Sequence, residues 1–120
     1  MMIFCKARLL VRRIFDYSIE IAGDIYSKYG SNASFKGWYL SFEVDNWNFL
    51  TSTQWDRMNV FYQNVSNYLK SLNSSKTVMI SPFYNTFGGQ TSAAWQTMWQ
   101  YILAANPNID ILALQDGVGA

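Results

Sequence analysis

The stretch that decides the fold is Gly37-Trp38-Tyr39-Leu40-Ser41-Phe42-Glu43, inside a predicted strand over Lys36–Val44. Successive side chains of a strand point to opposite faces. This alternation separates two sets of residues: Trp38, Leu40 and Phe42 on one face, and Tyr39, Ser41 and Glu43 on the other. If the apolar set packs under helices, the polar set points inward, with Glu43 at the end of the strand. A carboxylate there is costly to bury unless it is solvated, paired or protonated, which is the environment of a general acid. Glu43 is therefore the candidate general acid, with a structural glutamate bonded to a neighbouring strand end as the alternative.

Further along the chain, helix and strand patterns alternate in the order αβαβαβ. Apolar spacing predicts helices over about Asp16–Tyr29, from near Thr53 to Leu72, and from Thr91 or Ser92 to Asn106. The remaining strands are predicted over Thr77–Ile80 and Ile109–Leu114. The apolar face of the first helix is predicted to contain Tyr17, Ile21, Ile25 and Tyr29. That of the second contains Met58, Phe61, Tyr62, Val65, Tyr68, Leu69 and Leu72, and Trp95 and Trp99 belong to the core side of the third.

This order indicates parallel strands joined by right-handed crossovers, in an open doubly wound sheet or in a closed barrel. No strand-to-helix turn has the glycine fingerprint of a dinucleotide or phosphate loop, and Gly88 and Gly89 lack the following Lys-Ser/Thr. Each predicted strand instead ends in polar residues, as in barrel enzymes. We therefore predict part of a (β/α)8 TIM barrel, with three parallel strands alternating with three helices.

The residues that follow the strands are the candidate substrate-binding set, because the carboxyl ends of parallel strands meet at one edge of a sheet. Aromatic rings there offer flat apolar surfaces to sugar rings, and polar neighbours orient them. Loop capping is nearly as good an explanation for the polar members that follow Glu43, and a strand-end cap is as good for the last two. The candidates are Tyr39, Asp45, Asn46, Trp47, Ser81, Phe83, Tyr84, Gln115 and Asp116.

Composition narrows the classes of function. Of the 120 residues, 18% are aromatic and 14% are charged, with a formal net charge of +1. This balance gives no electrostatic footprint for nucleic acid, and no apolar run reaches the roughly 18 residues that span a bilayer. With no histidine and the single Cys5, the usual zinc sites and histidine triads are excluded within the chain. We therefore expect no metal site, no cofactor, no nucleic-acid partner and no membrane partner.

Residues 1–15 differ in composition from the rest of the chain. They contain four basic residues and no acidic one, whereas the remaining 105 contain five basic and eight acidic residues. Without a small-residue cleavage site they make a poor signal peptide. We predict an atypical head over residues 1–15, formed by a fragment of a preceding element, and the central fragment of a barrel domain over 16–120. The cellular location stays open, and a secreted or periplasmic parent protein is compatible with the sequence.

Three ordered motifs resemble the domain-of-unknown-function family 4434, whose members are glycoside-hydrolase-like TIM barrels. They are Gly37-Trp38-Tyr39 followed by Glu43, then Ile80-Ser81-Pro82-Phe83, then the segment from Asp110 to Ala120. The resemblance covers about Asp16 to Ala120 and implies that the strands are the fourth, fifth and sixth of eight. It also places Glu43 where many retaining glycosidases carry an acid/base glutamate. Two features depart from that pattern: Phe42 stands where an asparagine usually precedes the glutamate, and the strand that would bring a nucleophile is not in the chain.

The resemblance thus implies a fragment of a glycoside hydrolase that acts on a polysaccharide or oligosaccharide. Two alternatives remain: a carbohydrate-binding barrel without catalysis, and an inert truncated product that self-associates through exposed strand edges. Within the chain, Glu43 has only Asp45 or Asp116 as a second carboxylate. We therefore expect this chain to be inactive alone and its partner to be a carbohydrate.

Overall fold

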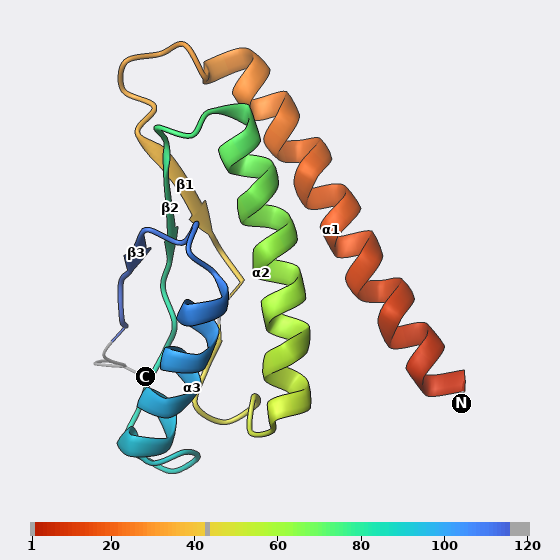
Figure 1. Ribbon diagram of the computed structural model, residues 1–120, viewed down its shortest axis with the longest axis vertical. Helices are drawn as coiled ribbons and strands as arrows, with labels where there is room; N and C mark the ends of the chain where they lie inside the picture. The colour runs from red at the N-terminus through yellow and green to blue at the C-terminus, as the bar shows by residue number, and fades with distance from the viewer. Residues whose placement is uncertain (1, 43, 116–120) are drawn as a thin grey trace.

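The computed structural model describes residues 2–42 and 44–115, with side chains from Arg12 onward. Helices and strands alternate along the chain (Figure 1). The elements are α1 (Met2–Tyr29), β1 (Gly37–Leu40), α2 (Ser52–Leu72), β2 (Thr77–Ile80), α3 (Ser92–Ala105) and β3 (Ile111–Leu112).

The three strands form one parallel sheet in the order β1-β2-β3. Trp38 lies opposite Val78, and Ile80 lies opposite Leu112. This confirms the predicted α/β fold, in which three parallel strands lie side by side in sequence order and alternate with three helices. Such a sheet with its helices is consistent with an arc of a barrel.

The pairing of β1 with β2 shifts by two residues after the end of β1. Leu40 lies opposite Ile80, whereas the next bridge joins Asp45 to Phe83. Between these two pairs, the segment that continues β1 therefore advances by five residues and the segment that continues β2 by three. Between β2 and β3 the register is constant, because the Met79–Ile111 and Phe83–Gln115 pairs have the same offset.

All three helices pack against one face of this sheet, which we call the helix face. Val78 and Ile80 of β2 are at most 1% exposed there. Trp38 and Leu40 of β1 pack against the same core, as their alternation predicts. One buried cluster joins α2 and α3 to the sheet: Val44, Met58, Tyr62, Ile80, Trp95, Met98, Trp99 and Ile102. A second joins α1 and α2 to it: Ala22, Val65, Leu69 and Val78.

The opposite face, which we call the open face, has no helix against it in the described part of the chain. Tyr39 of β1 is 49% exposed and Ile111 of β3 is 42% exposed. Both lie opposite Met79 in the pairing, so the three side chains share this face. In a closed barrel this face would point to the interior.

Local sequence fixes the starts of α2 and α3. Thr51 caps α2 in a capping box, in which its hydroxyl accepts from the Gln54 amide while the Gln54 side chain accepts from the Thr51 amide. Thr91 caps α3 by accepting from the Ala94 amide. The predicted starts lie within two residues of these, and the predicted Thr77–Ile80 strand coincides with β2.

Two predictions about α1 are wrong. The helix begins at Met2 and continues past Asp16 without a break, because the segment before Asp16 contains neither glycine nor proline. The predicted apolar face is also wrong, since Tyr17 is 64% exposed and Ile21 is 58% exposed. α1 contacts α2 through Ala22 and the adjacent Gly23 instead, where small side chains let the two helices approach closely.

The first and third strands are shorter than predicted. β1 ends at Leu40 rather than Val44, at the point where the register shifts, and β3 comprises only Ile111–Leu112. The third segment still bonds onward to the second, because the Ala113 amide donates to the Ile80 carbonyl and the Gln115 amide to the Pro82 carbonyl, both at 2.9 Å. The strand pairing therefore reaches the edge where the candidate residues gather.

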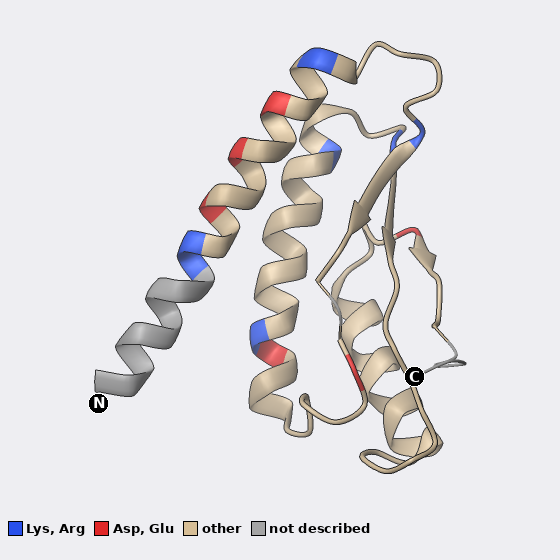
Figure 2. Cartoon of the chain, turned by 180° about the vertical axis from the view of Figure 1, so that it is seen from behind, with Lys and Arg blue, Asp and Glu red and all other residues tan. Residues whose placement is uncertain are grey.

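Charged residues concentrate on α1 among the described elements, whereas the sheet carries few (Figure 2). Within the described residues, no helix combines the length and the apolar character that crossing a bilayer requires.

Candidate functional site at the carboxyl ends of the strands

The candidate residues gather where the strands end and α2 and α3 begin, at the lower end of the molecule in Figure 1. The loops after β1 and β2 meet there. Two candidates, Glu43 and Asp116, lie outside the described residues, so the geometry of the site rests on the others.

Tyr39 and Phe83 contribute aromatic surface to the open face. Tyr39 is 49% exposed on β1. Phe83 bridges the two neighbouring segments, since it pairs with Asp45 on one side and with Gln115 on the other. Its position in the alternation after Met79 puts it on the same face as Tyr39. The described strand ends thus present rings on the face that a barrel would enclose.

Ser81 and Gln115 hold two strand ends together. The Ser81 hydroxyl donates to the Ala113 carbonyl at 2.7 Å, and the Gln115 side-chain amide donates to the Ser81 carbonyl at 2.8 Å. Both predicted donors are therefore engaged in cross-strand bonds, in agreement with the strand-end cap that the sequence left open for Gln115.

Asp45 caps the loop that follows β1. One carboxylate oxygen accepts from the amides of Trp47 and Asn48, both at 2.8 Å, and the other accepts from the Asn48 side chain at 2.6 Å. Three donors thus compensate the charge of this carboxylate. Asp45 serves as a loop cap in this structure, which is the alternative that the sequence allowed.

Asn46 connects the two loops and is fully buried. Its amide nitrogen donates to the carbonyls of Asn85 and Gly88, both at 3.0 Å, and its carbonyl oxygen accepts from the Asn85 amide at 3.3 Å. The side chain is enclosed and bonded at both ends, so it is not exposed to a ligand. It joins residues that are about forty positions apart in the sequence.

Trp47 lies beside this connection with 45% of its surface exposed. Its indole nitrogen donates to the side-chain oxygen of Asn85 at 3.3 Å. Asn85, a polar residue that follows the second strand, also contributes here but is not in the candidate substrate-binding set. Phe87, in the same loop, is 82% exposed.

Tyr84 points away from the open face. Its ring packs against Trp95 of α3 with the centroids 5.7 Å apart, next to the core that α2 and α3 share. This follows from alternation, because the neighbouring Phe83 occupies the open face. Tyr84 therefore serves packing in this structure.

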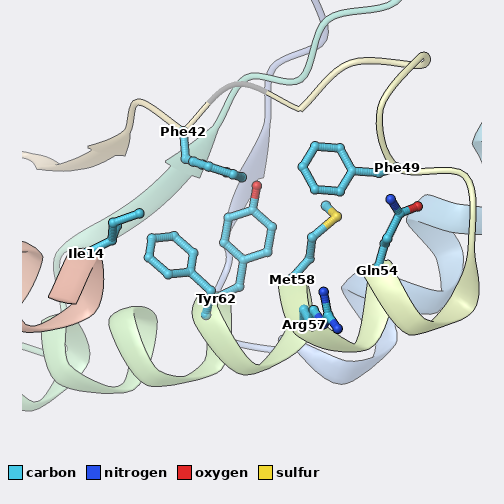
Figure 3. Close-up of a pocket in the computed structure, with 8 residues that line it drawn as sticks. Ile14, Phe42, Phe49, Gln54, Arg57, Met58 and Tyr62 are labelled. Carbon is cyan, nitrogen blue, oxygen red and sulfur yellow. The ribbon is translucent and has the colours of Figure 1, made fainter. Parts of the chain in front are cut away.

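A pocket of about 240 Å³ lies on the helix face, between α1, α2 and the loop after β1 (Figure 3). Phe42, Phe49 and Met58 form part of its apolar wall, and Phe42 packs against Phe49 with the centroids 6.1 Å apart. The phenol of the lining residue Tyr62 is largely buried, and burial raises the pKa of Tyr62, so it stays protonated. The pocket thus lies between packed elements, and none of the described candidate residues lines it.

The described strand ends and their loops are almost uncharged, since Asp45 is the only charged residue over 41–42, 44–51, 81–91 and 113–115. The described residues also contain no group of three or more His, Cys, Asp and Glu side chains that could hold a metal ion. The remaining side chains can stack against a ligand and donate or accept neutral hydrogen bonds. Asp110, whose pKa is lowered mainly by a hydrogen bond from Lys70, lies before β3 and away from this end.

Comparison with known proteins identifies the family. The match to a family model begins at residue 5. The family likeness therefore extends further toward the N-terminus than Asp16, where the resemblance of the sequence motifs begins. No curated protein and no solved structure matches the chain. The model of the family described as Domain of unknown function (DUF4434) matches residues 5–120, and the chain therefore belongs to this family.

Proposed function

We propose that the chain supplies the fourth, fifth and sixth strands of a barrel that hydrolyses glycosidic bonds in a polysaccharide or oligosaccharide, with Glu43 as the general acid. The observation that carries the proposal is the aromatic and weakly charged character of the described strand ends and the loops that follow them. Exposed Tyr39 and Trp47 lie at an edge where Asp45 is the only described charge. Aromatic surface with few charges suits a neutral ligand that has both apolar and hydroxyl-bearing faces, as a sugar has.

The role of Glu43 rests on the sequence and on the family resemblance. It follows an aromatic strand, two residues before the bridge of Asp45 with Phe83. A general acid at this place would protonate the leaving oxygen of the sugar, and its carboxylate would then take a proton from water.

We propose that the second carboxylate comes from elsewhere in the barrel rather than from Asp45. Glycoside hydrolysis uses two carboxyl groups about 5–5.5 Å apart for retention or about 6.5–9.5 Å apart for inversion. Asp45 accepts three hydrogen bonds from its own loop, which disfavours it as a nucleophile or base. We therefore expect the chain to be inactive without the remaining strands.

The test of catalysis uses a complete barrel that carries this arc. Glu43→Gln keeps the shape of the side chain and removes the titrating proton. A positioned general acid contributes about 10²–10⁴-fold, so natural glycosides should be hydrolysed more slowly by about that factor. An activated aryl glycoside, whose leaving group needs little protonation, should be affected far less in the glycosylation step. Glu20→Gln, on the exposed surface of α1, is the matched control and should leave both rates unchanged.

Each other outcome has a clear meaning. Equal slowing of both substrates would make Glu43 a positioning or structural residue. Unchanged rates would remove it from the mechanism.

A carbohydrate-binding barrel without catalysis is the second candidate. It is favoured by Phe42, which occupies the place of the asparagine that usually precedes the acid/base glutamate in the glycosidases that this strand resembles. Under this alternative the complete barrel would bind oligosaccharides but hydrolyse neither natural nor activated glycosides.

We also propose that the chain alone self-associates through its strand edges. β1 and β3 are the edges of the described sheet, and Ile111 and Leu112 of β3 are each at least 40% exposed. Sedimentation at micromolar concentration should show oligomers and heating should give a broad transition. A sharp two-state transition from a monomer would contradict this proposal.

A further inference from the structure

Hydrogen bonds of Asn46 join the loops after β1 and β2. The buried Asn46 makes three bonds to the second loop, and its backbone carbonyl accepts a fourth from the Gln90 amide at 2.8 Å. A fully satisfied buried amide of this kind fixes the relative position of the two segments that it joins. The residue that follows it is the exposed Trp47.

Asn85 fixes the orientation of that ring. Its side-chain oxygen accepts two hydrogen bonds, one from the indole nitrogen of Trp47 at 3.3 Å and one from the backbone amide of Phe87 at 3.1 Å. The single hydrogen-bond donor of the indole is therefore used within the protein. What Trp47 presents to a ligand is apolar ring surface.

Two glycines let the second loop pass close to the first. A Cβ on Gly88 would overlap the outer edge of the Trp47 ring, and one on Gly89 would overlap the Asn46 carbonyl oxygen. Both glycines have positive φ, 147° and 72°, which residues with side chains rarely adopt. The indole ring of Trp47 thus packs against Gly88, where no side chain intervenes.

We infer that Trp47 is a stacking platform for one pyranose ring of a neutral oligosaccharide, and that Asn46 is its positioning residue. The inference deepens the proposed carbohydrate function and rests on it. A large ring that is exposed on one part and supported on another loses little conformational freedom when a sugar covers it. The apolar C–H face of a pyranose matches a ring surface without free donors, whereas a phosphate or carboxylate would find no described cation in these loops.

The experiment measures binding in a complete barrel that carries this arc, in the Glu43→Gln background so that the probes survive. The probes are cellohexaose, β-1,4-mannohexaose and xylohexaose, titrated by calorimetry. Trp47→Ala should weaken binding of the hexaose that the protein accepts by about tenfold or more. Tyr17→Ala removes a more exposed ring, on α1, and should leave binding unchanged.

Asn46 is tested through its coupling to the ring. Asn46→Ala should weaken binding when Trp47 is present and should have no further effect in the Trp47→Ala background. Labelling with 5-fluorotryptophan adds a spectroscopic signature: Trp47→Phe identifies the Trp47 resonance, and Asn46→Ala should shift that resonance most. A purely structural role would give equal losses in both backgrounds.

The outcomes distinguish a failure of the Trp47 platform from a failure of the proposed carbohydrate function. If a hexaose binds and Trp47→Ala binds it equally well, the platform is refuted while the carbohydrate function stands. If Asn46→Ala weakens binding by the same factor with and without Trp47, the positioning role is refuted. If none of the hexaoses binds the parent protein, the proposed carbohydrate function itself is overturned, together with the platform.

Discussion

Helices α2 and α1 carry similar apolar patterns but have opposite surroundings. The pattern of α2 is buried, with Tyr62 and Leu69 each 1% exposed, whereas the predicted pattern of α1 leaves Tyr17 and Ile21 more than half exposed. α2 lies between α1 and α3 and covers the sheet, and α1 has only α2 as a helical neighbour in the described part of the chain. Periodicity therefore shows that a helix has an apolar face, but the number of neighbours decides whether that face is covered.

The largest expected difference between the two helices comes from deleting a side chain on each. Leu69→Ala should destabilise the protein by about 2–5 kcal/mol, because it removes buried methyl groups and leaves a cavity. Ile21→Ala should change the free energy of unfolding by about 0.5 kcal/mol or less, because the side chain is exposed. Urea denaturation of both variants measures this. A loss above about 1 kcal/mol for Ile21→Ala would show that another surface covers α1 in solution.

The contact between α1 and α2 can be tested by enlarging a side chain of α1. Ala22 is 7% exposed and packs against Val65 and Leu69. Ala22→Leu should cost about 1–3 kcal/mol, because the larger side chain forces the helices apart. Ile25→Leu, with a similar volume before and after, is the control. Thermal unfolding that left Ala22→Leu as stable as the parent protein would place the contact face elsewhere.

Substitutions at the observed and predicted helix starts should have a smaller effect on the free energy of unfolding. Thr51→Ala removes the cap of α2 and should cost about 1 kcal/mol. Asp16→Ala should cost almost nothing, because α1 begins at Met2 and Asp16 lies in its interior. Equal losses from the two substitutions, measured by urea denaturation, would restore Asp16 as a helix start.

The smallest expected effect concerns the ion pair that ties α2 to the segment before β3. Asp110 accepts from Lys70 at 2.7 Å and from the Val78 amide at 2.8 Å, and these bonds lower the pKa of Asp110 below its usual 3.8. Its contribution should be full above pH 3.8 and disappear as the pH falls through the lowered pKa. Asp110→Asn should thus cost up to about 1 kcal/mol at pH 7.

The cost of Asp110→Asn should be smaller near pH 2 than at pH 7, because protonation of Asp110 removes the charge that asparagine lacks. Denaturation at the two pH values measures this difference. A cost that did not change with pH would show that the charge of Asp110 is irrelevant.

Much of the fold could be predicted because local and tertiary signals agree. In β2 and α3 the residues with strand or helix patterns are also the buried ones, so Thr77–Ile80 and the Thr91 start follow from sequence. The shift after Leu40 has no sequence signal of this kind, since alternation continues through it. The start of α1 was missed because an acidic residue that could cap a helix is also tolerated inside one.

That the candidate residues lie near one another was predictable, but the contacts of each were not. Parallel topology brings the strand ends together, and the residues there are those that sequence selects. Whether a polar side chain faces a ligand or its own loop depends on contacts between segments about forty residues apart, such as Asn46 with Asn85. A single strand pattern holds no information about those contacts.

The two-residue shift between Leu40 and Asp45 limits how this strand can change length during evolution. Because side chains alternate, removing or adding one residue there would exchange the two faces for everything that follows up to the loop. Val44, fully buried on the helix face, would then turn outward, and Asp45 would enter the core. Removing both extra residues would preserve the orientation of each side chain. Homologous chains should therefore differ in length over this segment by even numbers of residues.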